Sequence, residues 1–269
     1  MKYFGSYSVE NESTSEFEEI DRLAAQAILS WQKEAELMTI YGLKSGMNIL
    51  EVGSGPGFVS KQMLDTWQDL NLTMLEADPS MIVKAKTHLE GYQGIFIEDF
   101  LETNRLESNQ FDVVFARLVL QHLVSPLTAI KEIYRLLKPN GKIIISDVDA
   151  NFWGTVQPYQ SGLEHIYQKY AIEQAKSGGN RLNVSQISQM LKESNFKNVR
   201  TDVFSYNSDE LGLTPFLPQI RPERYDSLLR KGIINEMEYA HLYASYQRLI
   251  NDPKVFVLLM GIMACGEKP

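Results

Sequence analysis

Three glycines at alternate positions follow a short apolar run, and they are the residues best suited to holding a ligand for chemistry. The run is Ile49-Leu50-Glu51-Val52, and the glycine stretch is Gly53-Ser54-Gly55-Pro56-Gly57. Glycine lets the backbone turn tightly and lets a ligand approach it closely. The apolar run is typical of a buried parallel strand, and apolar residues then recur at helical spacing over 59–67. A strand, a glycine loop and a helix in this order predict the first crossover unit of a nucleotide-binding fold.

The residues around the glycines argue against two common phosphate-binding motifs. A dinucleotide fingerprint requires glycine at its sixth position, which is Phe58 when Gly53 is the first. A phosphate-cradling loop would end in Gly-Lys-Ser/Thr, whereas Gly57 is followed by Phe58 and Val59. Glu51, directly before the turn, is unfavourable beside phosphates but suits a cationic ligand. The loop therefore favours a ligand that carries positive charge.

Carboxylates follow the next predicted strand, residues 72–76. An acid at the carboxyl end of the second strand can accept hydrogen bonds from both hydroxyls of a ribose. Glu76 and Asp78 both stand there and compete for that role. Asp78 precedes Pro79, which can begin a helix, so Asp78 is also suited to capping that helix. A third acid, Asp99, ends the strand predicted near residues 94–100.

The stretch Leu-Glu-Val-Gly-Ser-Gly-Pro-Gly, residues 50–57, resembles the first motif of class I S-adenosylmethionine-dependent methyltransferases. Later blocks are similar to the same family and stand in order: Phe-Asp-Val-Val (111–114), Leu-Gln-His-Leu (120–123) and Arg-Leu-Leu-Lys-Pro-Asn-Gly (135–141). Within the family, the chain is similar to the small-molecule type, such as the ubiquinone and menaquinone biosynthesis methyltransferases. The cofactor of this family is a sulfonium cation without phosphate, in agreement with the features of the loop.

The resemblance implies which residues hold S-adenosylmethionine. Its amino-acid end would lie on Gly53, Gly55 and Arg117, and its ribose on Glu76. Its adenine would lie between Met81 and the pair Asp99-Phe100, with Asp99 accepting from the adenine amino group. The full cofactor set implied is Glu51, Gly53, Ser54, Gly55, Gly57, Glu76, Ala77, Met81, Asp99, Phe100 and Arg117. The alternative for Asp99 is that it caps the turn after its strand.

His122 is the best-placed candidate for a catalytic base. It lies just past the fourth predicted strand, residues 111–116, where acceptor and cofactor should meet, and the pKa of imidazole suits neutral pH. The alternative is a histidine hydrogen-bonded inside the turn. A base is needed only if the acceptor must lose a proton, because the cofactor already carries its activation. No grouping of His, Asp and Glu has metal-ligand spacing, so we predict no metal.

Two further segments are predicted to cap the site. Residues 16–40 read as one helix, and similar methyltransferases carry a Tyr…Glu…Arg-Leu…Gln segment here, matched by Tyr7, Glu19, Arg22, Leu23 and Gln26. Residues 1–45 would then be an N-terminal helical lid, or else a helix packed on the sheet edge. Residues 207–251 are predicted to be an inserted substrate cap. Its tyrosine stripe would either face the acceptor or belong to the core: Tyr239, Tyr243 and Tyr246.

The order of elements predicts one α/β domain over residues 1–269, a Rossmann-like doubly wound sheet with helices on both faces. The resemblance implies seven mostly parallel strands with an antiparallel last strand. The cofactor-binding core would span 46–150, and residues 151–206 and 252–269 would complete the sheet. Residues 153–178 read as a helix, and residues 198–205 and 255–264 as the last two strands.

Composition limits the partners. The net charge of −8 and pI near 5.2 disfavour a polyanion, so no nucleic-acid partner is predicted. A single cysteine, Cys265, excludes an intrachain disulfide and a thiolate metal cluster. The longest apolar run, residues 255–265, is too short to cross a bilayer and no signal peptide is readable, so we expect a cytoplasmic protein without a membrane partner.

These observations predict an enzyme that transfers a methyl group from S-adenosylmethionine to a small, apolar or aromatic metabolite. The reaction would be an in-line displacement that releases S-adenosylhomocysteine. Two other classes of protein remain open: a non-catalytic cofactor-binding or scaffold protein, and an NAD-dependent oxidoreductase, which Phe58 disfavours. The sequence does not predict the acceptor, the atom methylated or the oligomeric state.

Overall fold

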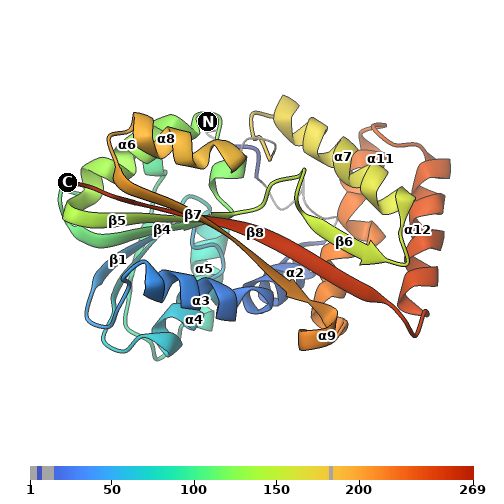
Figure 1. Ribbon diagram of the computed structural model, residues 1–269, viewed down its shortest axis with the longest axis horizontal. Helices are drawn as coiled ribbons and strands as arrows, with labels where there is room; N and C mark the ends of the chain where they lie inside the picture. The colour runs from blue at the N-terminus through green and yellow to red at the C-terminus, as the bar shows by residue number, and fades with distance from the viewer. Residues whose placement is uncertain (1–4, 8–14, 182–183) are drawn as a thin grey trace.

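The computed structural model describes residues 5–7, 15–181 and 184–269 of the chain. In that part, eight strands form one sheet with helices on both faces (Figure 1). The predicted α/β fold is confirmed, and one short strand raises the count from the expected seven to eight. The strands are β1 (Asn48–Val52), β2 (Asn71–Glu76), β3 (Ile95–Glu98), β4 (Phe111–Arg117), β5 (Leu137–Asp147), β6 (Gly154–Gln157), β7 (Lys197–Asn207) and β8 (Phe256–Glu267).

The first five strands are parallel and lie in the order β3-β2-β1-β4-β5. Ile49 of β1 lies between Leu72 of β2 and Val113 of β4, so the carboxyl ends of these three strands share one edge of the sheet. β8 is antiparallel to β5 on one side and to β7 on the other, which confirms the antiparallel last strand. A ligand site is expected where the parallel strands end.

Two apolar layers enclose the sheet because successive strand residues point to opposite faces. Ile49 packs with the side that carries α3 and α4, and Leu50 packs with the side that carries α6 and α8. The helices are α2 (Glu16–Leu29), α3 (Trp31–Ile40), α4 (Phe58–Thr66), α5 (Pro79–His88), α6 (Pro126–Leu136), α7 (Ser161–Lys176), α8 (Ile187–Glu193), α9 (Ser208–Leu211), α10 (Leu217–Ile220), α11 (Asp226–Arg230) and α12 (Glu236–Ile250). Short 3₁₀ turns are η1 (Leu101–Thr103), η2 (Leu120–His122), η3 (Val184–Gln186), η4 (Thr214–Phe216) and η5 (Pro222–Tyr225).

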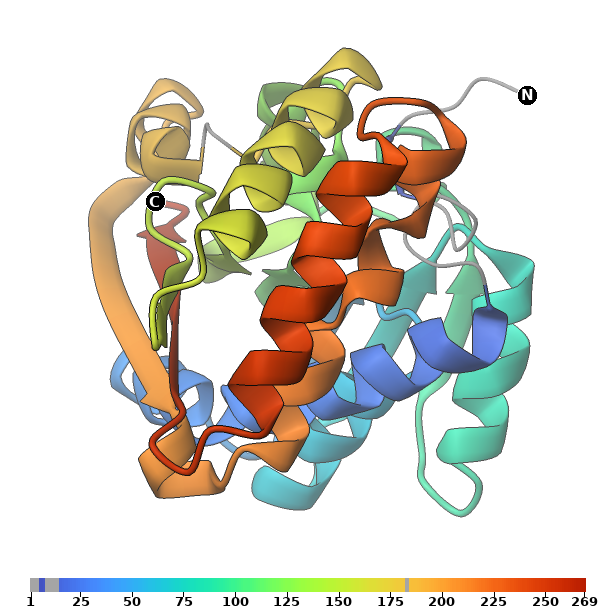
Figure 2. The ribbon, with the colours of Figure 1, turned by 90° about the vertical axis from the view of Figure 1, so that its right-hand side faces the viewer.

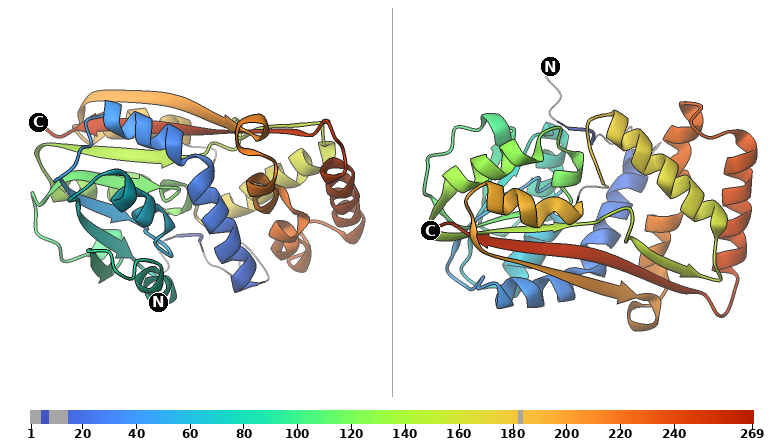
Figure 3. Two further views of the ribbon diagram at one scale, coloured as in Figure 1. Left: turned by 90° about the horizontal axis from the view of Figure 1, so that it is seen from below. Right: turned by 45° about the horizontal axis from the view of Figure 1, so that its top comes forward.

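The helix expected over residues 16–40 is two helices, α2 and α3, which meet at Ser30. The Ser30 hydroxyl donates to Glu34 one turn into α3 at 2.7 Å, and this side-chain bond accompanies the change of direction. Seen from below, α2 lies between the helices that cover the sheet and the helices near residues 207–251 (Figure 3, left). The bend therefore carries α2 off the sheet and toward the carboxyl edge of the strands.

β8 is longer than the sheet core requires, and its two halves serve different neighbours. Residues 262–267 pair with β5, whereas residues 256–259 pair with β6, which continues the line of β5. The helix expected over residues 153–178 is wrong in its first part, because residues 154–157 form β6 and the helix begins at Ser161. α7 then packs against α12, as Figure 2 and the right panel of Figure 3 show. No helix in the described ranges is long and apolar enough to cross a membrane.

Candidate functional site

A cavity of about 440 Å³, the large cavity, opens at the carboxyl ends of β1, β2 and β4. Of the residues implied for the cofactor, only Gly57 is absent from its lining; the lining includes Glu51, Gly53, Ser54, Gly55, Glu76, Ala77, Met81, Asp99, Phe100 and Arg117, together with the candidate base His122. The topology thus brings these side chains together. Their individual roles toward a cofactor stay predictions.

The glycine loop leaves room for a ligand at Gly55. Its φ is +53°, and a Cβ built there would meet no heavy atom of the described residues within 4 Å, so this part of the loop has space beside it. Gly57 has a different task, since its Cβ would come 3.1 Å from Ala85 and Leu89 of the neighbouring α5 segment. Gly57 therefore serves close helix packing, which explains why it does not line the cavity.

His88 supports the loop from behind, a role that the sequence did not reveal. Its ring stacks on Phe58 with centroids 4.4 Å apart, and its Nδ1 lies 2.7 Å from the Pro56 carbonyl oxygen. If Nδ1 carries the proton, it donates to that carbonyl. Phe58 itself lines the large cavity, at the position where a dinucleotide fingerprint would have glycine.

Glu76 and Asp78, the two candidates for the ribose, have different surroundings. Both Glu76 carboxylate oxygens accept backbone hydrogen bonds, Oε2 from Gly55 at 2.8 Å and Oε1 from Asp78 at 2.9 Å. The side chain of Asp78 accepts from Ser80 and caps α5, so the predicted capping role of Asp78 is confirmed. Glu76 is left with oriented oxygens at the cavity wall, each with a further lone pair for a hydroxyl.

Asp99 and Phe100, predicted to hold the adenine, lie at the cavity and also bond to each other. Asp99 Oδ1 accepts from the Phe100 amide at 2.8 Å and from the Thr103 hydroxyl at 3.4 Å. This is the turn-capping arrangement that the sequence left as an alternative for Asp99. Recognition of adenine through the Phe100 amide would require that amide to exchange partners.

Glu51 is a buried carboxyl group at the floor of the large cavity. It is 2% exposed, and burial raises its pKa to about 7, although a hydrogen bond from the Ser60 hydroxyl and the charge of Arg117 act in the opposite direction. The neighbouring Ser54 hydroxyl is buried and has no hydrogen-bond partner in the described ranges of the chain. A buried acid and a hydroxyl with hydrogen-bonding capacity to spare fit the ammonium-bearing, hydrogen-bonding end of S-adenosylmethionine.

Arg117 lines the large cavity, but most of its guanidinium is already engaged. Its Nε donates to both oxygens of Glu34 at 3.0 Å, and its Nη2 donates to the Ser30 hydroxyl at 2.8 Å and to the Gln26 carbonyl at 2.9 Å. Glu34 is 1% exposed and also accepts from Ser146. Arg117 therefore fixes α2 and α3 to the ends of β4 and β5, a positioning role that competes with the predicted direct contact to the cofactor.

The residues that match the family's N-terminal segment form a connected group above the large cavity. The Tyr7 hydroxyl donates to Glu19 at 3.0 Å, and Arg22 donates to both oxygens of Glu19 at 2.7 and 2.8 Å. Arg22 Nη1 donates to the Gln219 side chain at 3.2 Å, whose amide donates back to the Arg22 carbonyl at 2.9 Å. α2 is thus tied directly to α10 in the segment 207–251. That both segments act as lid and cap stays a prediction.

His122 is held by a chain of hydrogen bonds that determines which ring nitrogen carries its proton. Arg181 can only donate, and its Nε bonds Gln174 Oε1, so the Gln174 amide nitrogen must face the other way. That nitrogen lies 2.9 Å from His122 Nδ1, which therefore accepts the bond. In the neutral ring the proton then sits on Nε2, and His122 is better suited to donating a hydrogen bond than to acting as the predicted base.

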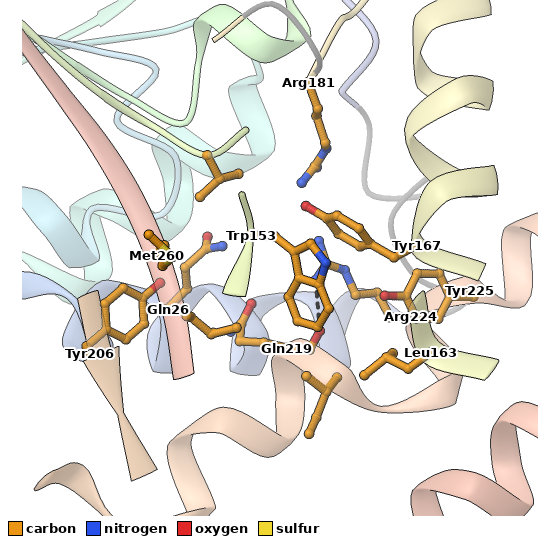
Figure 4. Close-up of a pocket in the computed structure, with 13 residues that line it drawn as sticks. Gln26, Trp153, Leu163, Tyr167, Arg181, Tyr206, Gln219, Arg224, Tyr225 and Met260 are labelled. Atoms are coloured by element: carbon orange, nitrogen blue, oxygen red, sulfur yellow. Dashed lines mark hydrogen bonds between the residues drawn. The ribbon is translucent and has the colours of Figure 1, made fainter. Parts of the chain in front are cut away.

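A second, smaller cavity of about 60 Å³ adjoins the large one (Figure 4). The two share Gln26, Arg181 and Arg224 in their linings. Aromatic side chains make up much of the remaining wall: Trp153, Tyr167, Tyr206 and Tyr225. In Figure 4 the guanidinium end of Arg181 points into the space between these rings, with Arg224 below it in this view. This small cavity offers space for a second ligand beside the large one.

The tyrosine stripe on α12 lines neither cavity. Tyr239 donates to Asp226 at 2.5 Å and packs with Tyr246 against the apolar core, while Tyr243 is 45% exposed. For Tyr239 and Tyr246, the structure therefore supports the alternative that they belong to the core. The segment 207–251 reaches the small cavity through other residues, Gln219, Ile220, Arg224 and Tyr225, which carry no helical stripe in the sequence.

Comparisons with known proteins agree with this architecture. A family model described as a methyltransferase domain matches residues 50–145. The malonyl-[acyl-carrier protein] O-methyltransferase of Paenibacillus sp. (strain JDR-2) is 25% identical over 156 residues, covering 56% of this chain and 55% of that protein. The ubiquinone biosynthesis O-methyltransferase of Pasteurella multocida (strain Pm70) is 27% identical over 166 residues, covering 52% of this chain and 68% of that protein.

Solved structures share the fold at low identity. Phosphoethanolamine N-methyltransferase 2 of Haemonchus contortus, in complex with phosphomonomethylethanolamine and S-adenosylhomocysteine, is 20% identical with a TM-score of 0.57, covering 89% of this chain and 53% of that one. A Bacillus halodurans C-125 protein described as a methyltransferase is 18% identical with a TM-score of 0.55, covering 87% of this chain and 98% of that one.

Fold, glycine loop and family match together define residues 50–145 as a class I S-adenosylmethionine-dependent methyltransferase domain. The resemblance inferred from the sequence is thereby confirmed. The chain spans 55% and 68% of the two curated relatives named above, and the family match ends before β6 and α7 begin. The acceptor must therefore be inferred from the cavities themselves.

Proposed function

We propose that this chain is an enzyme that transfers a methyl group from S-adenosylmethionine to a small acceptor bound beside it. The observation that carries the proposal is the junction of two cavities: the family's cofactor motifs line the large one, and the small one shares Gln26, Arg181 and Arg224 with it. A scaffold protein would need the first cavity but not the second. Gln26 of α2 lies at the junction and belongs to both linings.

The residues of this chain would bind and orient both reactants. Glu76 would accept from the ribose hydroxyls, Glu51 would sit beside the cationic amino-acid end, and Ser54 would find the partner that it lacks. Bound S-adenosylmethionine supplies a methyl group already activated on a sulfonium. The contribution of the protein would be to hold the acceptor in line with that group and to exclude water from it, for which α2 is placed above the cavity.

The dimensions of the small cavity favour a small metabolite over a polynucleotide or a long peptide. Its aromatic walls, Trp153, Tyr167, Tyr206 and Tyr225, support the aromatic or apolar acceptor expected from the sequence. With Nδ1 accepting from Gln174, the neutral ring of His122 at the cavity wall carries its proton on Nε2. The neutral ring of His122 would then not act as the catalytic base.

Calorimetry with S-adenosylhomocysteine and with NAD tests the proposal. We expect binding of S-adenosylhomocysteine and none of NAD, because Phe58 stands where a dinucleotide fingerprint needs glycine. Labelled S-adenosylmethionine with small-metabolite extracts should then give a labelled product. Binding without any transfer would support the scaffold alternative, and binding of NAD alone would support the oxidoreductase.

We expect cofactor binding to release a proton near pH 6.5. The raised pKa of Glu51, about 7, means that its carboxyl is largely protonated below that pH in the ligand-free protein. A cationic ligand favours the carboxylate and lowers the pKa, so affinity should rise by up to about tenfold per pH unit until pH 7 and then level off. Calorimetry in buffers of different ionisation enthalpy measures the proton released.

The matched control is Glu51→Gln, which should abolish the proton release. Since a raised pKa means that the folded protein binds this proton more tightly than the unfolded chain, the stability linked to Glu51 is present below pH 4.5 and lost as pH rises through about 7. Ligand-free Glu51→Gln should therefore melt at or above the parent temperature at pH 8. Equal proton release in parent and variant would contradict this role of Glu51.

A further inference from the structure

Arg224 is a buried cation whose hydrogen-bonding capacity is incompletely used. It is 8% exposed, and its one hydrogen bond to the described residues runs from Nη1 to the Gln219 carbonyl at 2.8 Å (dashed in Figure 4). Its Nε is buried and has no hydrogen-bond partner among the residues that the structure describes. Within the described part of the chain, no carboxylate lies within 4 Å of its guanidinium. An arginine buried in this way is costly unless a ligand completes its surroundings.

Arg224 shares the aromatic ring of Tyr170 with a second guanidinium, that of Arg181. Arg181 and Arg224 stand 4.8 and 5.6 Å from the centroid of Tyr170, so two positive charges share one buried neighbourhood. Arg181 is 5% exposed; it donates to Gln174 and, through Nη2, to the Tyr170 hydroxyl at 3.1 Å. Like charges repel one another strongly where water is excluded, and both side chains are buried.

A buried acid that Arg181 influences, Asp147, is already held by backbone hydrogen bonds. Asp147 is buried, and both of its oxygens already accept backbone bonds, from Val148 at 2.9 Å and from Gln121 at 3.1 Å. Burial raises its pKa to about 7, against the influence of Arg181 and Arg117. Asp147 is thus partly protonated at neutral pH, and it does not line the small cavity.

We propose that the methyl acceptor carries an anionic group, a carboxylate or a phosphate, that binds between Arg181 and Arg224 in the small cavity. Both arginines line that cavity and the junction with the large one, so a group held there would place the rest of the acceptor toward the methyl donor. Guanidinium groups bind both kinds of oxyanion through charge-assisted hydrogen bonds. With about 60 Å³ of space, the small cavity takes the charged end and one adjoining part of the acceptor.

The inference rests on the proposed function and narrows it. It replaces a purely apolar acceptor with one that is apolar or aromatic in its body and negatively charged at one end. It also disfavours a cationic amine as acceptor, because the same two arginines would repel it. The competing assignment for the arginines is the carboxylate of the cofactor's own amino-acid end, since they also line the large cavity.

Calorimetry with a matched set of probes tests the proposal on protein saturated with S-adenosylhomocysteine. Phenylacetate and phenylphosphate represent the two anions, and phenylacetamide is the neutral equivalent of phenylacetate. We expect at least one anion to bind about tenfold or more tightly than phenylacetamide, as charge-assisted bonds to arginine predict. The tighter anion identifies the group. Equal binding of amide and anions, or binding of neither anion, would overturn the proposal.

Arg224→Met should abolish the preference for the anion while S-adenosylhomocysteine affinity changes by less than about threefold, because no cofactor contact is lost. Arg224→Lys, which keeps the charge without the planar fork, should retain part of the preference. Arg221→Met is the control for lost charge, since Arg221 bonds the Glu18 carbonyl at 2.8 Å and lines neither cavity. It should keep the preference in full.

Two results would separate the assignments. If Arg224→Met loses as much affinity for S-adenosylhomocysteine as for the anionic probe, the arginine binds the cofactor carboxylate and the inference is overturned. Failure of the parent protein to bind S-adenosylhomocysteine at all would instead refute the proposed function. The melting temperature of ligand-free Arg224→Met guards against misfolding, and we expect it to equal or exceed that of the parent because an incompletely bonded buried charge is removed.

Discussion

Replacing Glu34 by alanine is expected to lower the free energy of unfolding by about 3–5 kcal/mol, the usual cost of leaving one partner of a buried ion pair without the other. Both Glu34 oxygens accept from Arg117 Nε at 3.0 Å, and the two side chains are 1% and 9% exposed. Without Glu34 the Arg117 guanidinium would remain buried with only Ser30 and the Gln26 carbonyl as acceptors. Denaturant unfolding followed by circular dichroism measures the loss.

The double variant Glu34→Met with Arg117→Met is the control. It removes both charges, so much of the stability should return. Cofactor affinity should be lowered in both variants, because this ion pair helps to hold the end of α2 above the large cavity. If Glu34→Ala lowers the free energy of unfolding by less than about 1 kcal/mol, the ion pair contributes no more than an exposed salt bridge does. That result would contradict the positioning role of Arg117.

The second large effect is expected in cofactor binding. Glu76→Ala should weaken S-adenosylhomocysteine binding by about 1.5–3 kcal/mol, the worth of hydrogen bonds to a charged acceptor. This corresponds to roughly a 10- to 150-fold rise in Kd. The variant removes both oriented oxygens and the bond to the Gly55 amide, so the glycine loop also loses a support. Titration calorimetry at constant pH gives the affinity.

Asp78→Ala distinguishes the two neighbouring acids. Asp78 caps α5 through the Ser80 amide at 2.8 Å, so its loss should cost about 1 kcal/mol of stability and leave the cofactor affinity unchanged. The reverse pattern, with affinity lost in Asp78→Ala and kept in Glu76→Ala, would move the ribose contact to Asp78. Both variants should be compared at a temperature well below their melting points.

Local patterns were sufficient for the core of the fold because its strands are buried on both faces. Runs such as Ile49 to Val52 read directly as parallel strands, and the Asp78-Pro79 pair marked a helix start that the structure confirms. β6 was missed because it forms by pairing with residues 256–259, a distant segment that the local pattern does not reveal. The bend at Ser30 was missed for a similar reason, because contacts with distant residues interrupt a helical pattern that is continuous in the sequence.

The cofactor half of the candidate site followed from motifs, whereas the acceptor half did not. Arg181 and Arg224 are brought together by the packing of α7 against the segment 207–251, and no spacing in the sequence signals their meeting. The tyrosines at helical spacing on α12 gave a visible pattern, but such a pattern shows only which residues share a face of the helix. What that face contacts is decided by neighbours such as Asp226.

The central place of β8 determines when this sheet can be completed during synthesis. Among the described strands, β7 pairs with β8 alone and only β8 covers one edge of β5, so both strands have unsatisfied backbone groups until residues 256–267 arrive. A ribosome-bound chain that ends before residue 256 would expose two open strand edges, which favour pairing with other chains. Release of β8 from the exit tunnel is therefore the step at which a nascent chain passes from aggregation-prone to native.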